Sequence, residues 1–374
     1  MNARAAERHG TRVLALVTDA FGGHGGIAQY NRDFLAALAG CEDVEEVIVL
    51  PRATAESAGK MPFRVRQLRP VKGRIAYSLA ALWTTLTSQS IGFVFCGHLF
   101  MTPLAAGLAR LLRVPLWIQV HGTDAWEELS RLQRWSIESA TLVTSVSRYT
   151  RQRLLQWIAI DPARVKVLPN TVDPRFCPGA KPDYLLDRHG VRNHKVLLTV
   201  SRIVASERYK GHDRVIRALP QLMTEHPDVI YLIVGDGDDC LRLEALAAEY
   251  GVAKKVRFVG QAPPDELPDY FRLADLFVMP STGEGFGIAF LEAIATGVPV
   301  IAGNQDGSRD ALCDGALGTL VDTENLDELV LAIHAALLSS RSVRMTDRGE
   351  RFGLDHFARH INVLLHYGVG LKNG

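Results

Sequence analysis

Short runs of β-branched and apolar residues alternate with longer stretches of helical spacing along almost the whole chain of 374 residues. In the first half, the runs that predict buried strands are Arg12–Val17, Val47–Leu50, Phe93–Cys96, Leu116–Val120 and Leu142–Ser145. In the second half they are Val196–Val200, Val229–Val234, Val256–Val259, Leu276–Met279 and Val298–Ala302. Strands that alternate with helices are typical of parallel sheets covered by helices on both faces. The pattern therefore predicts a doubly wound α/β fold.

A segment rich in proline and glycine separates the two series. It begins at Val165–Asp173 and continues through Pro174, Pro178, Gly179 and Pro182. Because a chain of this length can form two cores, we expect one Rossmann-like domain over residues 1–171 and another from residue 172. Ligands of open α/β sheets lie beyond the carboxyl ends of the strands. The expected place for two substrates is therefore a cleft between the two domains.

Charge is unevenly distributed, although the formal net charge is only +1. Residues 1–170 carry 20 Lys and Arg against 13 Asp and Glu, whereas the rest of the chain carries 22 against 28. The overall balance gives no sign of a nucleic-acid partner. A basic first half, including the run from Arg64 to Arg74, favours an anionic partner such as a membrane surface or a lipid diphosphate. An ordinary solvated surface explains the same charges equally well.

Cysteine usage and hydropathy indicate a cytoplasmic protein, either free or at the inner face of the cell membrane. The five cysteines are scattered without a Cys-x-x-Cys pair, which argues against a disulfide framework or a zinc site. The uncharged stretch Ile75–Ala109 has the length of a membrane span, but six polar residues between Thr84 and Ser90 interrupt it. We expect a helix, a buried strand at Ile91–Cys96 and a second helix within a soluble core.

A glycine-rich turn, Gly22–Gly26, follows the first predicted strand and opens a helix at Ile27–Leu38. Glycines allow close approach of a ligand to the backbone, and a helix N-terminus offers free N–H groups to a diphosphate. Gly25 and Gly26 are the candidate contacts. The turn matches neither the dinucleotide fingerprint nor a P-loop.

Two cations follow the first strand of the second series. Arg202 can grip a phosphate through paired N–H donors, and Lys210 adds a point charge. Together they could stabilise a departing nucleoside diphosphate without a metal ion. A solvated loop is the competing interpretation.

A glycine turn with two carboxylates, Glu284 and Glu292, follows the strand Leu276–Met279. Glu292 lies in an otherwise apolar helix predicted over Phe286–Thr296, where burial is costly unless a partner such as a ribose diol satisfies the carboxylate. The backbone N–H groups of Phe286, Gly287 and Ile288 are candidates for holding phosphate or sugar oxygens. A capped helix with one partly exposed Glu is the alternative.

Two further groups follow strands. His121 comes directly after Leu116–Val120, where it could donate to a sugar hydroxyl or sense a phosphate. Asp236–Asp239 resembles an Asp-x-Asp metal motif, but N-capping and turn formation explain it adequately. Since no cluster has dedicated metal-ligand spacing, we expect no required metal and no cofactor.

Taken together and in this order, these blocks resemble glycosyltransferase family 4, which has the GT-B fold of two Rossmann-like domains. The segment from Glu284 to Glu292 looks like the family's E-x7-E signature, and Ala295–Ile301 like the segment that follows it. The resemblance implies a metal-independent, retaining hexosyltransferase that uses a nucleoside-diphosphate sugar. It also implies that the last helix, about Leu354–Tyr367 within residues 354–374, crosses back onto the first domain, which leaves 172–353 as the donor domain.

The resemblance also implies roles for individual residues. Arg202 and Lys210 would bind the donor diphosphate, and Glu292 the ribose. Glu284, with the amides of Phe286, Gly287 and Ile288, would bind the transferred sugar and phosphate. His121 would approach the hydroxymethyl side of the sugar. The remaining donor contacts would be Gly25 and Gly26 at the phosphate loop and Val259 and Gln261 beside the base.

The sequence departs from the family in two places. Asp310 stands where many relatives carry Glu, and the insertion Ala205–Tyr209 lengthens the loop between Arg202 and Lys210. The insertion looks like members that build bacterial exopolysaccharide on a polyprenyl diphosphate carrier, some of which use GDP-mannose. The acceptor would be a glycan or such a lipid-linked saccharide. A sugar-nucleotide epimerase or hydrolase and a non-catalytic sugar-nucleotide sensor are the alternatives.

Overall fold

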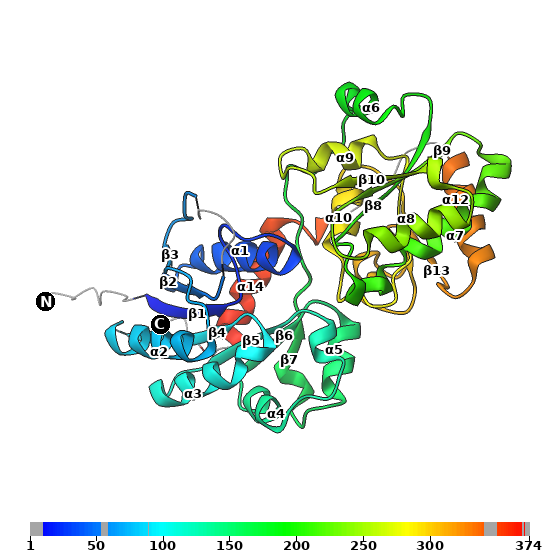
Figure 1. The fold of residues 1–374 in the computed structure, drawn as a ribbon. Helices are drawn as coiled ribbons and strands as arrows, with labels where there is room; N and C mark the ends of the chain where they lie inside the picture. Colours follow the sequence, from blue (N-terminus) through cyan, green and yellow to red (C-terminus); the bar gives the residue numbers. More distant parts are fainter. Residues whose placement is uncertain (1–9, 54–58, 89, 340–349, 369, 371–374) are drawn as a thin grey trace, which may run out of the picture. The chain divides into compact units, whose positions relative to one another are not determined.

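The computed structural model describes residues 10–53, 59–88, 90–339, 350–368 and 370. The chain forms two compact units (Figure 1). Unit 1 comprises Met1–Asn170 and Leu354–Gly374, and unit 2 comprises Thr171–Gly353. The division therefore falls one residue before the boundary expected from the sequence.

Unit 1 is built on a seven-stranded parallel sheet with the order β3-β2-β1-β4-β5-β6-β7. Its strands are β1 (Thr11–Val17), β2 (Val44–Pro51), β3 (Val65–Gln67), β4 (Ile91–Cys96), β5 (Leu116–Val120), β6 (Leu142–Ser145) and β7 (Val165–Val167). Its α-helices are α1 (Gly26–Ala39), α2 (Arg74–Thr87), α3 (Thr102–Leu112), α4 (Arg131–Glu138), α5 (Arg148–Leu155) and α14 (Leu354–Gly368). The strands β3 and β7, three residues each, are too short for the sequence pattern to predict.

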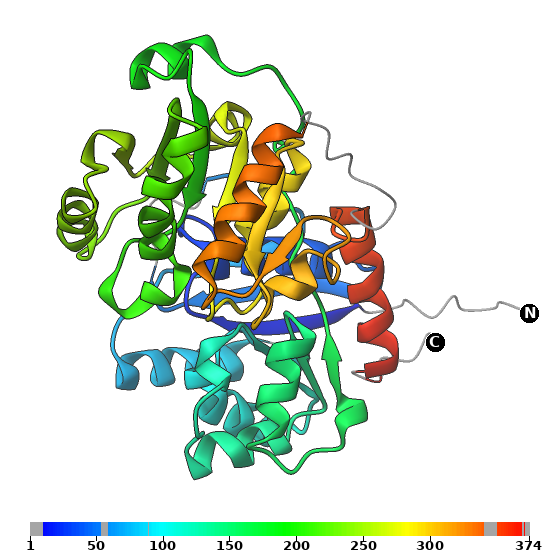
Figure 2. The ribbon, with the colours of Figure 1, turned by 90° about the vertical axis from the view of Figure 1, so that its right-hand side faces the viewer.

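Unit 2 contains a six-stranded parallel sheet with the order β10-β9-β8-β11-β12-β13. Its strands are β8 (Lys195–Val200), β9 (Val229–Val234), β10 (Val256–Gly260), β11 (Leu276–Met279), β12 (Val300–Gly303) and β13 (Thr319–Val321). Its α-helices are α6 (Asp183–His189), α7 (His212–Glu225), α8 (Cys240–Glu249), α9 (Leu267–Leu273), α10 (Ile288–Ala295), α11 (Ser308–Ala311) and α12 (Leu326–Leu338). Helices α7 and α12 lie side by side, as both views show (Figures 1 and 2).

Buried strands and the apolar faces of helices form a separate core in each unit. In unit 1, residues such as Leu14 and Val94 are fully buried, and in unit 2 Leu197 and Tyr231 are. The last helix, α14, belongs to unit 1 and packs against α1. The ring of Phe357 on α14 meets that of Tyr30 on α1 edge to face, with centroids 5.8 Å apart. The chain therefore ends on the unit in which it begins.

The uncharged stretch Ile75–Ala109 forms a helix, a strand and a second helix, as predicted, but the expectation that it lies wholly in the core is wrong. Helix α2 buries Tyr77, Ala81 and two threonines while its large apolar residues face outward. The exposed ones are Ile75, Leu79, Leu82, Trp83 and Leu86. Among the described residues, no helix has both the length and the apolar character needed to cross a membrane.

Candidate functional site

The order of strands reverses at one point in each sheet, and most of the predicted residues lie on the segments that follow these strands. In unit 2 the reversal lies between β8 and β11, because β8 is flanked by β9 on its other side. Arg202 follows β8, and the turn from Ser281 to Gly287 follows β11. Ligands of open α/β sheets bind at such a switch point, beyond the carboxyl ends of the strands.

The turn that carries Glu284 is held by a buried carboxylate, Asp306, which follows β12. The Oδ2 atom of Asp306 accepts hydrogen bonds from Ser281 Oγ and from the backbone N of Glu284, both at 2.7 Å. Its Oδ1 accepts from Ser308 N at 2.9 Å. In return, Gly307 N donates to the carbonyl oxygen of Glu284 at 2.8 Å. The backbone of Glu284 is thus fixed from both sides.

Two glycines make this close approach possible. A Cβ on Gly307 would lie 2.0 Å from the carbonyl oxygen of Gly285, a distance that no side chain tolerates. Gly287, with φ of 85°, precedes α10, and no side chain caps that helix. The first N–H groups of α10 therefore have no partner within the helix, as the prediction for Phe286, Gly287 and Ile288 requires.

Lys210 and Glu284 form an ion pair at the centre of the site. Lys210 Nζ donates to Glu284 Oε1, and both side chains are largely buried, with 13% and 12% of their surface exposed. Burial lowers the pKa of Lys210, but the carboxylates of Glu284 and Glu207 outweigh it, so that the net shift is upward. Lys210 is therefore a buried permanent cation directly beside the predicted sugar-binding carboxylate.

Glu207, which the sequence analysis did not single out, pairs with both predicted phosphate-binding cations. Its carboxylate accepts a hydrogen bond from Arg202, and its Oε2 atom lies 3.8 Å from Lys210 Nζ. Only 11% of the Glu207 side chain is exposed, whereas 73% of the Arg202 side chain is. Its place in the insertion between two cations was the one available signal for it.

The loop that carries Glu207 is the short helix η4 (Ala205–Lys210), and the Asp236–Asp239 segment anchors it. Asp238 Oδ1 accepts from Ala205 N at 2.7 Å, and Asp239 Oδ1 accepts from Arg208 at 2.9 Å. The expected N-cap is wrong, because the side chain of Asp239 makes no capping hydrogen bond to α8 and binds Arg208 and Arg242 instead. A carboxylate binds a charged guanidinium group more strongly than it binds the neutral backbone N–H groups at a helix start.

Glu292 lies on α10 and is partly buried, and its carboxyl group has no hydrogen bond or ion pair in the part of the chain that the structure describes. Burial, together with the nearby Asp173 carboxylate, raises the pKa of Glu292 to about 8. A buried carboxyl without a partner is unfavourable for the protein alone. Val259, in β10, and Gln261, just after it, lie at the edge strand of the same sheet.

In unit 1 the order reverses between β1 and β4, and the glycine turn follows β1. Gly25 has φ of 88° and precedes α1, which no side chain caps. Arg32 donates to the carbonyl oxygens of Ala20 and Gly23, at 3.0 and 2.7 Å, and so fixes the turn. Nothing lies within 4 Å of a Cβ built on Gly25, so its surroundings are open, as are the free amides at the start of α1, where Gly26 lies.

His121 follows β5, next to the reversal point. Burial and the nearby His98 lower the pKa of His121 to about 3, so the ring is neutral at physiological pH. Its Nε2 lies 3.0 Å from the carbonyl oxygen of Gly97 and must therefore carry the proton. The remaining nitrogen, Nδ1, can only accept a hydrogen bond, so the expected donor or charge-sensing role does not fit this ring.

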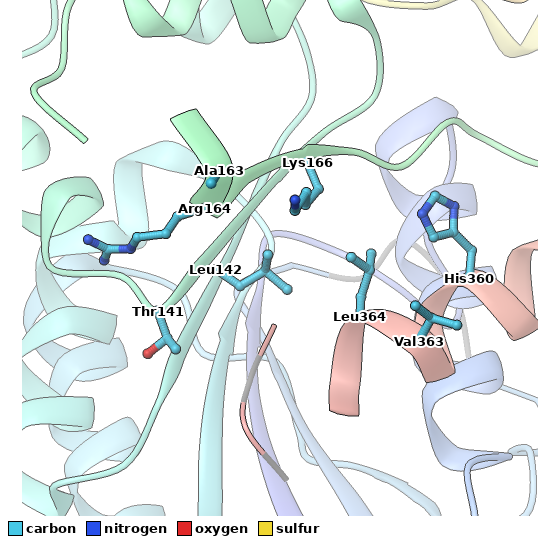
Figure 3. A pocket seen from close by; sticks show the side chains of 8 residues that line it. All are labelled: Thr141, Leu142, Ala163, Arg164, Lys166, His360, Val363 and Leu364. Atoms are coloured by element: carbon cyan, nitrogen blue, oxygen red, sulfur yellow. The ribbon is translucent and has the colours of Figure 1, made fainter. Parts of the chain in front are cut away.

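One pocket of about 460 Å³ lies apart from these residues (Figure 3). Its walls come from η3 (Pro162–Arg164), β7, α14 and the start of β6, with His360 and Lys166 among the labelled side chains. Because it adjoins the amino end of β6, it lies at the edge of the sheet opposite the reversal-point loops. None of the predicted site residues lines it.

The described residues contain no group of three or more His, Cys, Asp or Glu side chains arranged to hold a metal ion. The site in unit 2 instead combines a buried and an exposed cation, carboxylates and free amides along a turn and a helix. These groups suit a ligand that carries phosphate, hydroxyl groups and a diol. The fold and this site together define a nucleotide-sugar-binding protein of the two-domain GT-B class.

Comparison with known proteins identifies the family. The profile described as "Glycosyl transferases group 1" matches residues 187–352, and that described as "Glycosyltransferase Family 4" matches residues 24–176. The chain belongs to glycosyltransferase family 4 and is a nucleotide-sugar glycosyltransferase.

Two curated relatives are both described as GDP-mannose-dependent alpha-(1-6)-phosphatidylinositol monomannoside mannosyltransferases. The one from Mycolicibacterium smegmatis is 36% identical over 68% of this chain and 69% of its own length. The one from Mycobacterium tuberculosis H37Rv is 31% identical over 91% and 93%. A crystal structure of Anabaena HepE in complex with UDP is similar in fold, with a TM-score of 0.76, 22% identity and coverage of 95% and 99%.

Proposed function

We propose that this chain is a retaining mannosyltransferase that takes mannose from GDP-mannose and transfers it to a saccharide carried on an anionic lipid. The observation that carries the proposal is the buried Lys210–Glu284 ion pair at the reversal point of the second sheet. A permanent positive charge beside a carboxylate suits the point where a leaving diphosphate meets its sugar, and this supports the proposal. The two mannosyltransferases named above, at 36% and 31% identity, favour GDP-mannose as the donor.

In this proposal unit 2 makes most of the donor contacts, and unit 1 makes the others and contributes to the acceptor side. Arg202 and Lys210 neutralise the diphosphate, and the amides at the start of α10 take further phosphate or sugar oxygens. Glu292, which has no partner in the described part of the chain, accepts from the two ribose hydroxyls.

The other predicted residues would make further contacts with the donor. Glu284 accepts from hydroxyl groups of the mannose, and Nδ1 of His121 accepts from the hydroxymethyl side. Val259 and Gln261 border the base, while Gly25 and Gly26 line the phosphates.

The proposed reaction is a substitution at the sugar C1 on the face that the diphosphate leaves. The bond between the sugar C1 and the diphosphate oxygen breaks, and the acceptor hydroxyl oxygen bonds to C1 from the same face. The acceptor's proton passes to the leaving phosphate oxygen, and the attack on the same face retains the configuration at C1. A double displacement would instead need a carboxylate free to attack C1 from the opposite face, whereas Glu284 is tied to Lys210.

The donor and the stereochemistry can be tested together. In a thermal-shift panel of GDP, UDP, ADP and their sugars, we expect GDP and GDP-mannose to raise Tm most. NMR of the product formed from GDP-α-mannose should show an α linkage. A preference for UDP would refute the donor, a β linkage would refute retention, and free mannose as the sole product would favour the hydrolase alternative.

Helix α2 supports a membrane location for the acceptor. Its exposed Ile75, Leu79, Trp83 and Leu86 recur at helical spacing and form one apolar stripe, with exposed fractions between 62% and 79%. Residues 57–123 contain no Asp or Glu but eight Lys and Arg, and Arg69, Lys72 and Arg74 are exposed next to the stripe. An apolar stripe flanked by cations is the combination that binds an anionic bilayer surface.

Vesicle sedimentation tests this membrane contact. Trp83→Ser should lower binding to vesicles of phosphatidylglycerol and phosphatidylcholine about tenfold, because the indole no longer enters the interface. Leu331→Ser, at a 67% exposed apolar residue of α12 in unit 2, is the matched control and should bind as the wild type does. Equal binding by the Trp83 variant would rule out α2 as the contact.

A further inference from the structure

The cations expected to hold the donor diphosphate are already neutralised in the unliganded chain. Arg202 and Lys210 contribute two positive charges, while Glu207 and Glu284 contribute two negative ones. A nucleoside diphosphate brings at least two further negative charges. If all four side chains stayed in place, the phosphates would lie beside a carboxylate that already binds the same cations, and like charges at such distances repel strongly.

Of the two carboxylates, Glu207 is the one that can leave. The Glu284 carboxylate accepts a hydrogen bond from Lys210, and the two side chains are only 12% and 13% exposed. The Oε2 atom of Glu207, by contrast, is buried without a hydrogen-bond partner and meets Lys210 only at 3.8 Å. Its other contact is with Arg202, whose side chain is 73% exposed and therefore free to move with a ligand.

Contacts of the neighbouring loop residues hold the backbone of Glu207 beside Arg202 and Lys210. Tyr209, two residues on, packs against Gly283, where a Cβ would lie 2.5 Å from its ring. The carbonyl oxygen of Tyr209 accepts from Thr282 N at 2.9 Å, which joins the loop to the Glu284 turn. With Ala205 held by Asp238 at the other end, the backbone on both sides of Glu207 is anchored. Release of Glu207 thus needs only its side chain to rotate.

We propose that the Glu207 carboxylate is an internal substitute for the donor phosphate, which the diphosphate displaces from Arg202 and Lys210 on binding. The proposal rests on the function proposed above, in which these two cations bind the donor. It assigns Glu207 a role in setting affinity: it competes with the diphosphate and, by returning to the cations, promotes release of the nucleoside diphosphate after transfer.

Calorimetry with GDP tests the proposal, because removing the competing carboxylate and removing a cation should change the Kd for GDP in opposite directions. In Glu207→Gln the competing charge is gone, and we expect the Kd for GDP to fall roughly tenfold. In Arg202→Gln a phosphate contact is lost, and Kd should rise roughly tenfold. Glu244→Gln, at an exposed residue of α8, is the charge-matched control and should leave Kd unchanged.

The outcomes separate this inference from the function on which it rests. If Arg202→Gln weakens binding while Glu207→Gln weakens it or leaves it unchanged, Glu207 is not displaced and the inference fails alone. If neither Arg202→Gln nor Lys210→Met changes Kd, the diphosphate site itself is wrong. Should Glu207→Gln fail to fold, as judged by circular dichroism, Glu207→Asp replaces it. Its shorter side chain reaches the cations less well, so a Kd for GDP that is not lowered would overturn the proposal.

Discussion

The two sheets reverse their strand order in the same way, but the loops at the two reversal points carry different chemistry. In unit 1 they carry glycines and a histidine, His121, whose pKa burial lowers to about 3. In unit 2 they carry Arg202 and Lys210 among several carboxylates. A neutral, hydrogen-bonding surface suits hydroxyl groups, whereas a charged and pre-paired surface suits a nucleoside diphosphate. The shared topology provides a ligand-binding position at the reversal point of each sheet, and the residues of the loops decide which ligand binds there.

In unit 2 the charged loops depend on a buried carboxylate, Asp306, and its substitution gives the largest expected effect. Asp306→Asn leaves one acceptor oxygen where three donors now converge, and we expect kcat/KM to fall about 10- to 100-fold because the Glu284 turn loosens. Burial raises the pKa of Asp306 to about 6, so the wild type should lose activity as pH falls through 6.

The pH profile of this variant is the decisive readout. Below pH 6 the variant should show no further decline, since its amide does not titrate. Asp187→Asn, at an exposed carboxylate that pairs with Arg192, serves as the control and should keep the wild-type profile. An unchanged acid limb in Asp306→Asn would show that another group controls it.

A smaller effect is expected at His121, where substitution by Asn and substitution by Gln should give different values of kcat/KM. Asn places its oxygen near the position of Nδ1, whereas Gln places its amide near Nε2. Because Nε2 already donates to Gly97, the free acceptor is Nδ1. We therefore expect His121→Asn to retain several-fold more kcat/KM than His121→Gln, with a loss of about tenfold in the latter. A higher rate for the Gln variant would reverse the assigned tautomer.

The smallest effect concerns stability and the ribose carboxylate. The pKa of Glu292 is raised to about 8 from an ordinary value of 4.5, so the folded chain holds this proton more tightly than the unfolded chain does. The free energy of unfolding should fall as pH rises from 4.5 to 8. Glu292→Gln removes this loss, and at pH 8.5 its Tm should exceed that of the wild type by roughly 2–4 °C.

This gain should shrink towards pH 5, where Glu292 is protonated in the folded wild type. Glu244→Gln, on the exposed side of α8, should follow the wild-type curve throughout. Parallel Tm curves for the Glu292 variant and the wild type would mean that the carboxyl is not strained in the unliganded chain.

The sequence predicted most of the fold because buried parallel strands are continuous apolar runs. The observed strands β5, β6, β9 and β11 begin and end at the predicted residues, whereas β3, β7 and β13 were missed because three residues carry no pattern. The exposure of one face of α2 was also not predicted, because the sequence of an apolar helix is the same whether the core or a membrane covers it.

The sequence predicted candidate site residues where charged residues or glycines follow the end of a strand, as Lys210 and Glu284 do. Their supporting contacts were not predicted, because they join segments far apart in the chain. Asp306 reaches Glu284 across 22 positions, and Asp239 reaches Arg208 across 31. The local pattern of Asp236–Asp239 indicated helix capping and a turn, and only the fold brings Arg208 within reach of Asp239.

A crystal structure of the chain with GDP would test the central claim most directly. The account predicts both phosphates within hydrogen-bonding distance of Arg202 and Lys210 Nζ, the ribose hydroxyls on Glu292, and the Glu207 carboxylate turned away from both cations. A diphosphate bound elsewhere, with the ion pairs of Glu207 and Glu284 intact, would contradict it.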